Sequence, residues 1–177
     1  VTKPNPGPHR IKSSIPLTLA LRDYLHVCEN FREVKKAIGT GKVLVDGKRA
    51  KDPKRALGLM DVVALEGSGK YYRILLDQRG RITLQDIPKK NSTWKLCRIN
   101  RKVYVKGGKK IQLGLHDGRN ILINEKDKKK YNCGDTLKIS VPEQKVLAKY
   151  PFKQGHTAMV IGGKHAGEHA VIKEKEV

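Results

Sequence analysis

Several features that define common protein classes are scarce in this 177-residue chain. It has three cysteines, Cys28, Cys97 and Cys133, which are far apart and include no C-x-x-C pair. That pattern fits neither a disulfide framework nor a zinc site, and it is typical of a reducing, intracellular compartment. No run approaches the roughly 20 apolar residues that a membrane-spanning helix needs, and no apolar segment near the start marks a secretory signal.

Acidic residues are also scarce. The chain has 17 Asp and Glu against 38 Lys and Arg, which gives a formal charge of +21. The excess is +7 in residues 1–70 (14 basic, 7 acidic), +12 in residues 71–141 (18 and 6) and +2 in residues 142–177 (6 and 4). Charge of one sign repels itself unless a polyanion is near. Since the charge is spread rather than gathered on one amphipathic helix, we expect a nucleic-acid partner and no membrane. Aromatic residues make up only 5%, so base stacking is expected to be secondary.

Motifs for catalysis and metal binding are lacking too. Gly163-Lys164 is no P-loop, because Ala158 stands where that motif has its first glycine and His165 where it has Ser or Thr. His165 and His169 lie four residues apart, but nearby glycines disfavour the helix that such a metal-binding pair would need. Three aspartates stand beside turns and are expected to cap backbone: Asp61, Asp117 and Asp135. We therefore expect no catalytic residue, no metal and no cofactor.

The first two segments predict an arm and a small helical module. Residues 1–13 are rich in proline and predict a basic, extended arm rather than a helix or a central strand. Residues 14–70 begin with a helix capped by Ser14 that carries an apolar stripe to Cys28. A second helix begins at Asn30, which forms an N-x-x-E capping box with Glu33. Next come a short strand (43–45), the Asp46-Gly47 hairpin turn and a second strand (62–65).

The rest of the chain has the pattern of short strands separated by turns. Residues 71–144 predict a central all-β domain, a barrel or a sandwich, in which only the lysine-rich stretch 126–130 is a loop. Residues 145–177 predict a β-hairpin with strands at 157–161 and 170–173 around a glycine-rich loop. The candidate strands of the central domain are 71–76, 81–86, 94–99, 102–106, 110–115, 120–124 and 136–141. The fold class is therefore α+β and mostly β.

Two local motifs resemble known RNA-binding elements. The helix, the capped helix and the V-x-V-D-G-K hairpin at 43–48 resemble the alpha-L domain named after ribosomal protein four, which implies that the second helix lies against RNA. Arg32, Lys35 and Lys36 project from one side of that helix, so the charge pattern agrees. The stretch 155–172 resembles a KOW motif, in which Gly167 occupies the loop glycine, although Ala170 replaces a glycine that this motif often has.

The order of the parts resembles one family over nearly the whole chain, the archaeal and eukaryotic small-subunit ribosomal proteins of the S-four-e family. P-G-P-H at 6–9, E-V-K-K at 33–36, G-x-M-D-V at 58–62, K-L-C at 95–97 and H-D-G-R at 116–119 carry the match. The family normally extends further at both ends, so we expect the chain to be trimmed. The resemblance implies a non-catalytic ribosomal constituent in the cytoplasm, with small-subunit ribosomal RNA and neighbouring ribosomal proteins as partners and no small-molecule substrate.

The cations expected to contact RNA are Arg10, Lys12, Arg32, Lys35, Lys36, Lys42, Lys48, Arg49, Lys51 and Lys164. Two other classes of function stay open. One is an RNA-modifying enzyme that uses an alpha-L module as its clamp and Asp77, Asp86 or Asp117 as its catalytic carboxylate. The other is a transcription elongation factor that binds polymerase through its KOW element.

Overall fold

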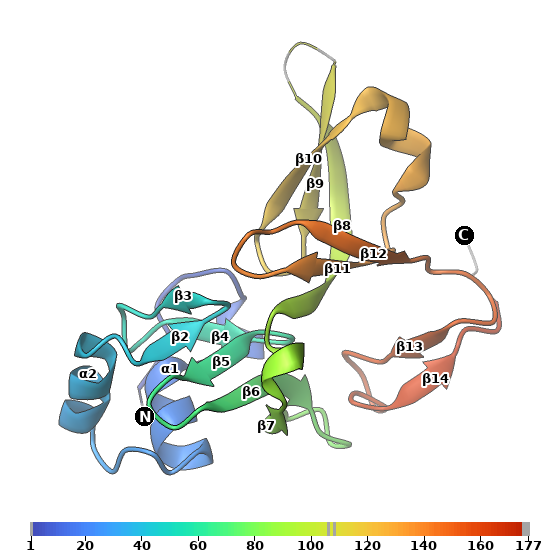
Figure 1. Cartoon of the computed structure of the whole chain (residues 1–177). Helices are drawn as coiled ribbons and strands as arrows, with labels where there is room; N and C mark the ends of the chain where they lie inside the picture. Colours follow the sequence, from blue (N-terminus) through green and yellow to red (C-terminus); the bar gives the residue numbers. More distant parts are fainter. Residues whose placement is uncertain (1, 106, 108, 175–177) are drawn as a thin grey trace.

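The computed structural model describes residues 2–105, 107 and 109–174, and it is mostly β, as expected. Two five-stranded antiparallel sheets dominate it (Figure 1). The first sheet has the strand order β3-β2-β5-β6-β7, and the second sheet has the order β10-β9-β8-β11-β12. Two-stranded pairs, β1-β4 and β13-β14, complete the architecture. None of the described helices is long and apolar enough to span a membrane.

The helical segments are η1 (Ile11–Ser13), α1 (Leu17–Leu19), the π-helix η2 (Ala20–Tyr24), α2 (Phe31–Gly39), η3 (Lys89–Asn91) and η4 (Glu125–Lys130). The strands are β1 (Ser14–Pro16), β2 (Val43–Val45), β3 (Lys48–Arg49), β4 (Ala56–Gly58), β5 (Val62–Leu65), β6 (Lys70–Leu76), β7 (Ile82–Ile87), β8 (Trp94–Tyr104), β9 (Lys110–Leu115), β10 (Asn120–Asn124), β11 (Thr136–Ser140), β12 (Val146–Tyr150), β13 (Thr157–Met159) and β14 (His169–Val171).

The start of the first helix differs from the prediction. Ser14 does not cap a helix, because its backbone pairs with Gly58 in the β1-β4 ribbon, and Pro16 occupies the N-cap position. The helix is also shorter than its apolar stripe, since α1 passes into one π-helical turn that ends at Tyr24. Pairing with a strand about 40 residues away overrides the local capping signal here, and such a partner is invisible to a local pattern.

The N-terminal arm packs against the residues around the first sheet and does not extend freely into solvent. Residues Ile11–Ser13 form a 3-10 turn, where the sequence predicts no helix. The backbone N–H of Asn5 donates to the Lys54 carbonyl at 2.8 Å, and the His9 ring is buried. His9 lies directly over Gly58, where a Cβ would stand 2.3 Å from the ring. The arm is therefore part of the packed structure.

The first sheet crosses the domain boundary expected after residue 70. β6 pairs with β5, and β7 pairs with β6, so both belong to the helical module's sheet. Ile74 of β6 is buried in the same hydrophobic core as Leu17, Leu21 and Val34. A module ending at residue 70 would leave that core open, which is why the strands as far as Ile87 complete it.

The second sheet is curved like half a barrel, which agrees with the all-β prediction for the central region. The predicted strands 94–99 and 102–106 are one strand, β8, with a register irregularity between Ile99 and Arg101. Lys106, at the end of the second predicted strand, lies outside the described residues. The predicted loop 126–130 is the 3-10 helix η4. The boundary expected after residue 144 is also wrong, because β12 pairs with β11 and the sheet ends only before Pro151.

The C-terminal hairpin β13-β14 is shorter than predicted and packs against the first sheet's β6-β7 turn (Figure 1). Gly167 has a φ of +91°, and a Cβ there would lie 1.8 Å from the Asp77 carbonyl oxygen. Glycine is required at this point both by the backbone conformation and by the close approach of the backbone segments at Gly167 and Asp77. The loop glycine of the KOW-like element thus serves an internal contact.

Candidate nucleic-acid interface

Helix α2 presents a fixed row of cations. Its N-terminus is closed as the sequence predicts, because the Glu33 N–H donates to the Asn30 side chain at 3.0 Å and the Glu33 carboxylate accepts from the Glu29 N–H at 2.8 Å. Val34 and Ile38 are buried, which fixes the rotation of the helix. Arg32, Lys35 and Lys36 are consequently exposed on the opposite side. The backbone holds this charged face in place before any partner arrives.

The β2-β3 hairpin extends this basic surface. Asp46 and Gly47 both have positive φ (51° and 73°), the conformation of a two-residue hairpin turn. Val43 and Val45 are buried while Lys48 and Arg49 are exposed, so the hairpin shows its cations outward. The Arg49 side chain lies over Gly41, where a Cβ would come within 3.4 Å of it. This contact places Arg49 beside the end of α2.

A groove continues from the hairpin between the two sheets. Its walls come from the N-terminal arm, the β3-β4 connection and the β9-β10 turn, and its basic lining residues are Lys48, Arg49, Lys51, Arg55 and Arg119. The Arg55 Nε is buried and has no hydrogen-bond partner among the described residues. Four aspartates also line the groove, Asp46, Asp52, Asp61 and Asp117, and Arg119 is paired with two of them. The cations left for an anionic ligand are Lys48, Arg49 and Lys51, which form no ion pair with the described residues.

All ten predicted RNA-contacting residues are exposed. The structure gathers Arg32, Lys35 and Lys36 on α2, and it lines the groove with Lys48, Arg49 and Lys51. Lys164 stands apart, in the loop of the separate β13-β14 hairpin (Figure 1). The remaining predicted residues are Arg10 and Lys12 in the arm and Lys42 before β2.

Sequence reasoning missed a buried cluster of charges beneath the groove, which we call the Lys95 cluster. The fully buried Lys95 Nζ lies 2.9 Å from Asp46, 2.7 Å from Asp61 and 2.8 Å from Asp117. Arg119 reaches Asp46 and Asp117, each at 2.9 Å. The cluster also contains His9, whose Nε2 lies 2.9 Å from Asp61. One signal was available: Lys95 alternates with Cys97 and Ile99 on β8, so it shares their buried face.

Three members of the Lys95 cluster, Asp61, Asp117 and Lys95, are held in their charged forms. Burial by itself would raise the pKa of Asp61, but the His9 hydrogen bond and the Lys95 ammonium outweigh it and lower that pKa below its usual range. Burial would likewise raise the pKa of Asp117, and Lys95 again lowers it. The pKa of Lys95 itself is raised, because its three carboxylates outweigh the effect of its burial. The turn aspartates do cap backbone as predicted, since Asp61 accepts from the Gly58 N–H and Asp117 from the Arg119 N–H.

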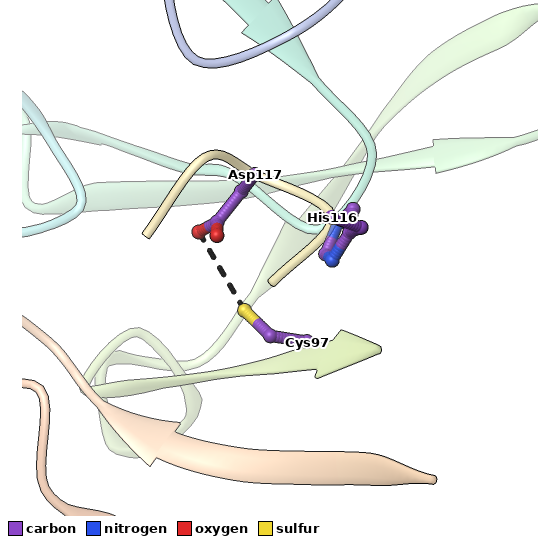
Figure 2. A group of neighbouring side chains, drawn as sticks. All are labelled: Cys97, His116 and Asp117. Carbon is purple, nitrogen blue, oxygen red and sulfur yellow. Dashed lines mark hydrogen bonds between the residues drawn. The ribbon is translucent and has the colours of Figure 1, made fainter. Parts of the chain in front are cut away.

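Cys97, His116 and Asp117 lie close enough to suggest a metal site, and Figure 2 shows them side by side. The Cys97 thiol donates to Asp117 at 3.5 Å, and burial raises its pKa, so it stays protonated. His116 Nε2 donates to the Leu59 carbonyl at 3.1 Å, so its Nδ1 is the acceptor for the Arg98 N–H. Burial lowers the pKa of His116, which agrees with a neutral ring. The arrangement offers a metal neither a thiolate nor a free imidazole lone pair, and the three side chains belong to the packing around the Lys95 cluster.

Two family models match this chain in consecutive segments. Residues 24–63, which include α2 and the β2-β3 turn, match the S4 domain, and residues 68–146 match ribosomal family S4e. Small ribosomal subunit protein eS4 of Methanocaldococcus jannaschii is 49% identical over 179 residues, covering 98% of this chain and 72% of that protein. The chain belongs to ribosomal family S4e.

Other S4e proteins agree in sequence and in fold. The eS4 protein of Methanothermobacter thermautotrophicus is 45% identical over 172 residues, covering 97% of this chain and 69% of that protein. The crystal structure of the 30S ribosomal protein S4e from Thermoplasma acidophilum superimposes with a TM-score of 0.80 at 33% identity, over 93% of this chain and 83% of that one. Most of this chain therefore shares the fold of that S4e protein.

Proposed function

We propose that this S4e protein is a non-catalytic constituent of the small ribosomal subunit, located on cytoplasmic ribosomes, that binds ribosomal RNA and neighbouring ribosomal proteins. Its first RNA contact is the face of α2 together with the β2-β3 hairpin and the basic groove. The observation that carries the proposal is the row of exposed cations that a capped, core-anchored helix presents within the matched S4 domain.

The chemistry of this surface suits the shape and phosphates of folded RNA. Lysine and arginine side chains contact phosphates without reading sequence, and the deep groove of an RNA helix hides most base edges. None of the ten predicted residues forms an ion pair with another described residue. Their charge is therefore available to a partner.

Two of the three carboxylates considered for an RNA-modifying activity have structural roles. Asp117 is buried in the Lys95 cluster, and Asp77 accepts the backbone N–H groups of Arg79 and Arg81 in the β6-β7 turn. Asp86 is exposed on β7. The pKa values of Asp77 and Asp117 are both lowered, so neither carboxyl keeps the proton that a general acid would donate near neutral pH.

The proposal is tested by sedimenting a cell extract through a sucrose gradient and detecting this protein across the fractions. We expect it in the small-subunit and whole-ribosome fractions, and we expect high salt to release it in part. Recovery with RNA polymerase and not with ribosomal subunits would instead favour the elongation-factor function.

A further inference from the structure

The 3-10 helix η4 concentrates positive charge at a place that the proposed interface does not include. Four of its six residues are lysines, and all four are exposed: Lys126, Lys128, Lys129 and Lys130. Lys109 is exposed beside them, because its carbonyl accepts the Glu125 N–H. Figure 1 shows η4, in orange after β10, at the opposite end of the molecule from α2.

The fold holds these lysines together with further cations. Lys102 Nζ donates to the carbonyl of Lys128 and, at 2.6 Å, to that of Tyr131. Lys149 Nζ donates to the Lys130 carbonyl. These bonds satisfy carbonyls at the end of the helix, where cations are favoured, and they bring two more lysines to the site. Of these two, Lys149 is also paired with Asp135 at 3.6 Å. Folding therefore brings like charges together at this position.

None of the helix lysines forms an ion pair with a described residue. Glu125 and Asp127 belong to the same helix, but neither forms an ion pair with a lysine in the described part of the chain. Lys128 and Lys130 lie over the rings of Tyr104 and Tyr131, at 4.8 and 5.6 Å from the ring centres. Those contacts orient two side chains without reducing their charge.

The other two lysines are arranged to meet one partner. Side chains three residues apart lie on the same side of a 3-10 helix, so Lys126 and Lys129 project together. Neither makes an aromatic or ionic contact with the described residues. Like charges that are held together and left unpaired match a polyanion, and the partner chemistry is a run of phosphates.

We propose that η4, with Lys126 and Lys129 foremost, is a second RNA-binding site that contacts the phosphate backbone of ribosomal RNA separately from α2. This inference rests on the proposed function, since it assumes that the chain binds ribosomal RNA. It assigns the strongly basic middle of the chain, where the sequence analysis placed no contact residue, a direct part in binding.

The test compares RNA binding by the parent protein, the K126Q/K129Q variant and a matched control. The control, K89Q/K90Q, removes two exposed lysines from another 3-10 helix, η3. Binding to small-subunit ribosomal RNA is measured against salt concentration. Each lost phosphate contact lowers the log–log slope by roughly 0.7 to 0.9, so K126Q/K129Q should lose about 1.4 to 1.8 while K89Q/K90Q keeps the parent slope. The charge-retaining K126R/K129R variant should bind like the parent.

Hydroxyl-radical footprinting of the RNA shows which RNA segment each site contacts. K126Q/K129Q should lose protection over one RNA segment, and the R32Q/K35Q/K36Q variant should lose it over a different one. A second measurement uses the unaltered protein: bound RNA should shield Lys126 and Lys129 from acetylation, read by mass spectrometry. That readout holds even where a variant fails to fold.

The outcomes separate this inference from the proposed function. A parent protein that binds no ribosomal RNA would contradict the proposed function. A parent that binds, with α2 protected and Lys126 and Lys129 still freely acetylated, would overturn the second site alone. Equal losses in K126Q/K129Q and K89Q/K90Q would also overturn it, because net charge would then explain the effect. Unchanged RNA binding with lost crosslinks to a neighbouring ribosomal protein would make η4 a protein contact.

Discussion

Lys95 connects three separate segments of the structure through its ion pairs. Its side chain is fully buried, yet it meets three carboxylates contributed by the β2-β3 turn, the start of β5 and the β9-β10 turn. A buried ion of this kind is stable only while its partners remain, because removing one partner leaves the others uncompensated. The cluster therefore makes the relative position of the two sheets depend on single side chains.

Replacing Lys95 with methionine tests this dependence. The K95M variant keeps the volume but leaves Asp46, Asp61 and Asp117 without their shared cation. We expect a loss of about 3 to 5 kcal/mol in the free energy of unfolding, measured by urea denaturation at neutral pH. A loss below about 1 kcal/mol would mean that the carboxylates find other partners.

The same cluster predicts how stability depends on pH. Because the folded pKa values of Asp61 and Asp117 lie below the usual value of about 3.9, both groups contribute stability at neutral pH. That contribution is lost as the pH falls below about 5 toward the lowered pKa values of the two aspartates in the folded state. Unfolding measured from pH 7 to pH 3 should show the parent losing stability. The deficit of K95M relative to the parent should shrink over the same range, since its unpaired carboxylates gain from protonation.

Gly167 can be tested against a glycine of similar conformation. Gly163 also has positive φ, +84°, but a Cβ there meets nothing within 4 Å, whereas at Gly167 it meets the Asp77 carbonyl. Gly163→Ala should cost only backbone strain, about 1 kcal/mol. Gly167→Ala should cost that strain and also separate the hairpin from the β6-β7 turn. Hydrogen exchange should therefore speed up across β13 and β14 in G167A and not in G163A; equal exchange in both would contradict the contact.

At the scale of elements, local signals were enough for α2 and for the turns. The N-x-x-E pattern at Asn30 and the Asp46-Gly47 pair each correctly predict a backbone conformation, because the cause lies within four residues. Where the cause lay elsewhere in the chain, prediction failed: Ser14 pairs with Gly58, and β6 joins β5 rather than the central sheet. The exposed cations of α2 could be predicted from their helical spacing. The Lys95 cluster, by contrast, joins turns that lie up to 71 positions apart in the sequence, from Asp46 to Asp117.

We expect the exposed face of helix α2 to contribute to RNA binding and its buried face to contribute to stability. Replacing Arg32, Lys35 and Lys36 together with glutamine should weaken binding to ribosomal RNA while leaving the unfolding free energy within about 0.5 kcal/mol per site, since these side chains are exposed. Filter binding and thermal unfolding measure the two effects. Lys89, Lys90 and Lys153, replaced together with glutamine, give a control of equal charge from exposed positions elsewhere.

The buried face of α2 should respond in the opposite way. Val34→Ala or Ile38→Ala removes core volume and should cost roughly 1 to 4 kcal/mol of unfolding free energy, with affinity per folded molecule unchanged. RNA binding that survives the triple glutamine variant at full strength would leave the cationic face of α2 as solvated surface.

At the scale of the whole molecule, separate contacts hold the parts in one arrangement. The Lys95 cluster joins the first sheet, the second sheet and the arm, and Gly167 seats the C-terminal hairpin on the β6-β7 turn. A third contact comes from Arg73 of β6, which donates to the Asn91 and Trp94 carbonyls and stacks on the Trp94 ring. Such bracing fixes the distance between α2 and η4, so an extended RNA can meet both without first ordering the protein.

This rigidity and the net charge of +21 together predict the form of the salt dependence. Affinity for ribosomal RNA should fall steeply and linearly on a log–log plot, with a slope of roughly 0.7 to 0.9 for each phosphate neutralised. If α2 and η4 bind at once on a fixed frame, the slope losses of R32Q/K35Q/K36Q and K126Q/K129Q should add in the combined variant, because distant sites without shared partners act independently. Titrations from about 50 to 200 mM salt on all four proteins measure this. A parent affinity that stays flat over that range would contradict the electrostatic mechanism, and slope losses that fail to add would mean that the two faces compete for the same stretch of RNA.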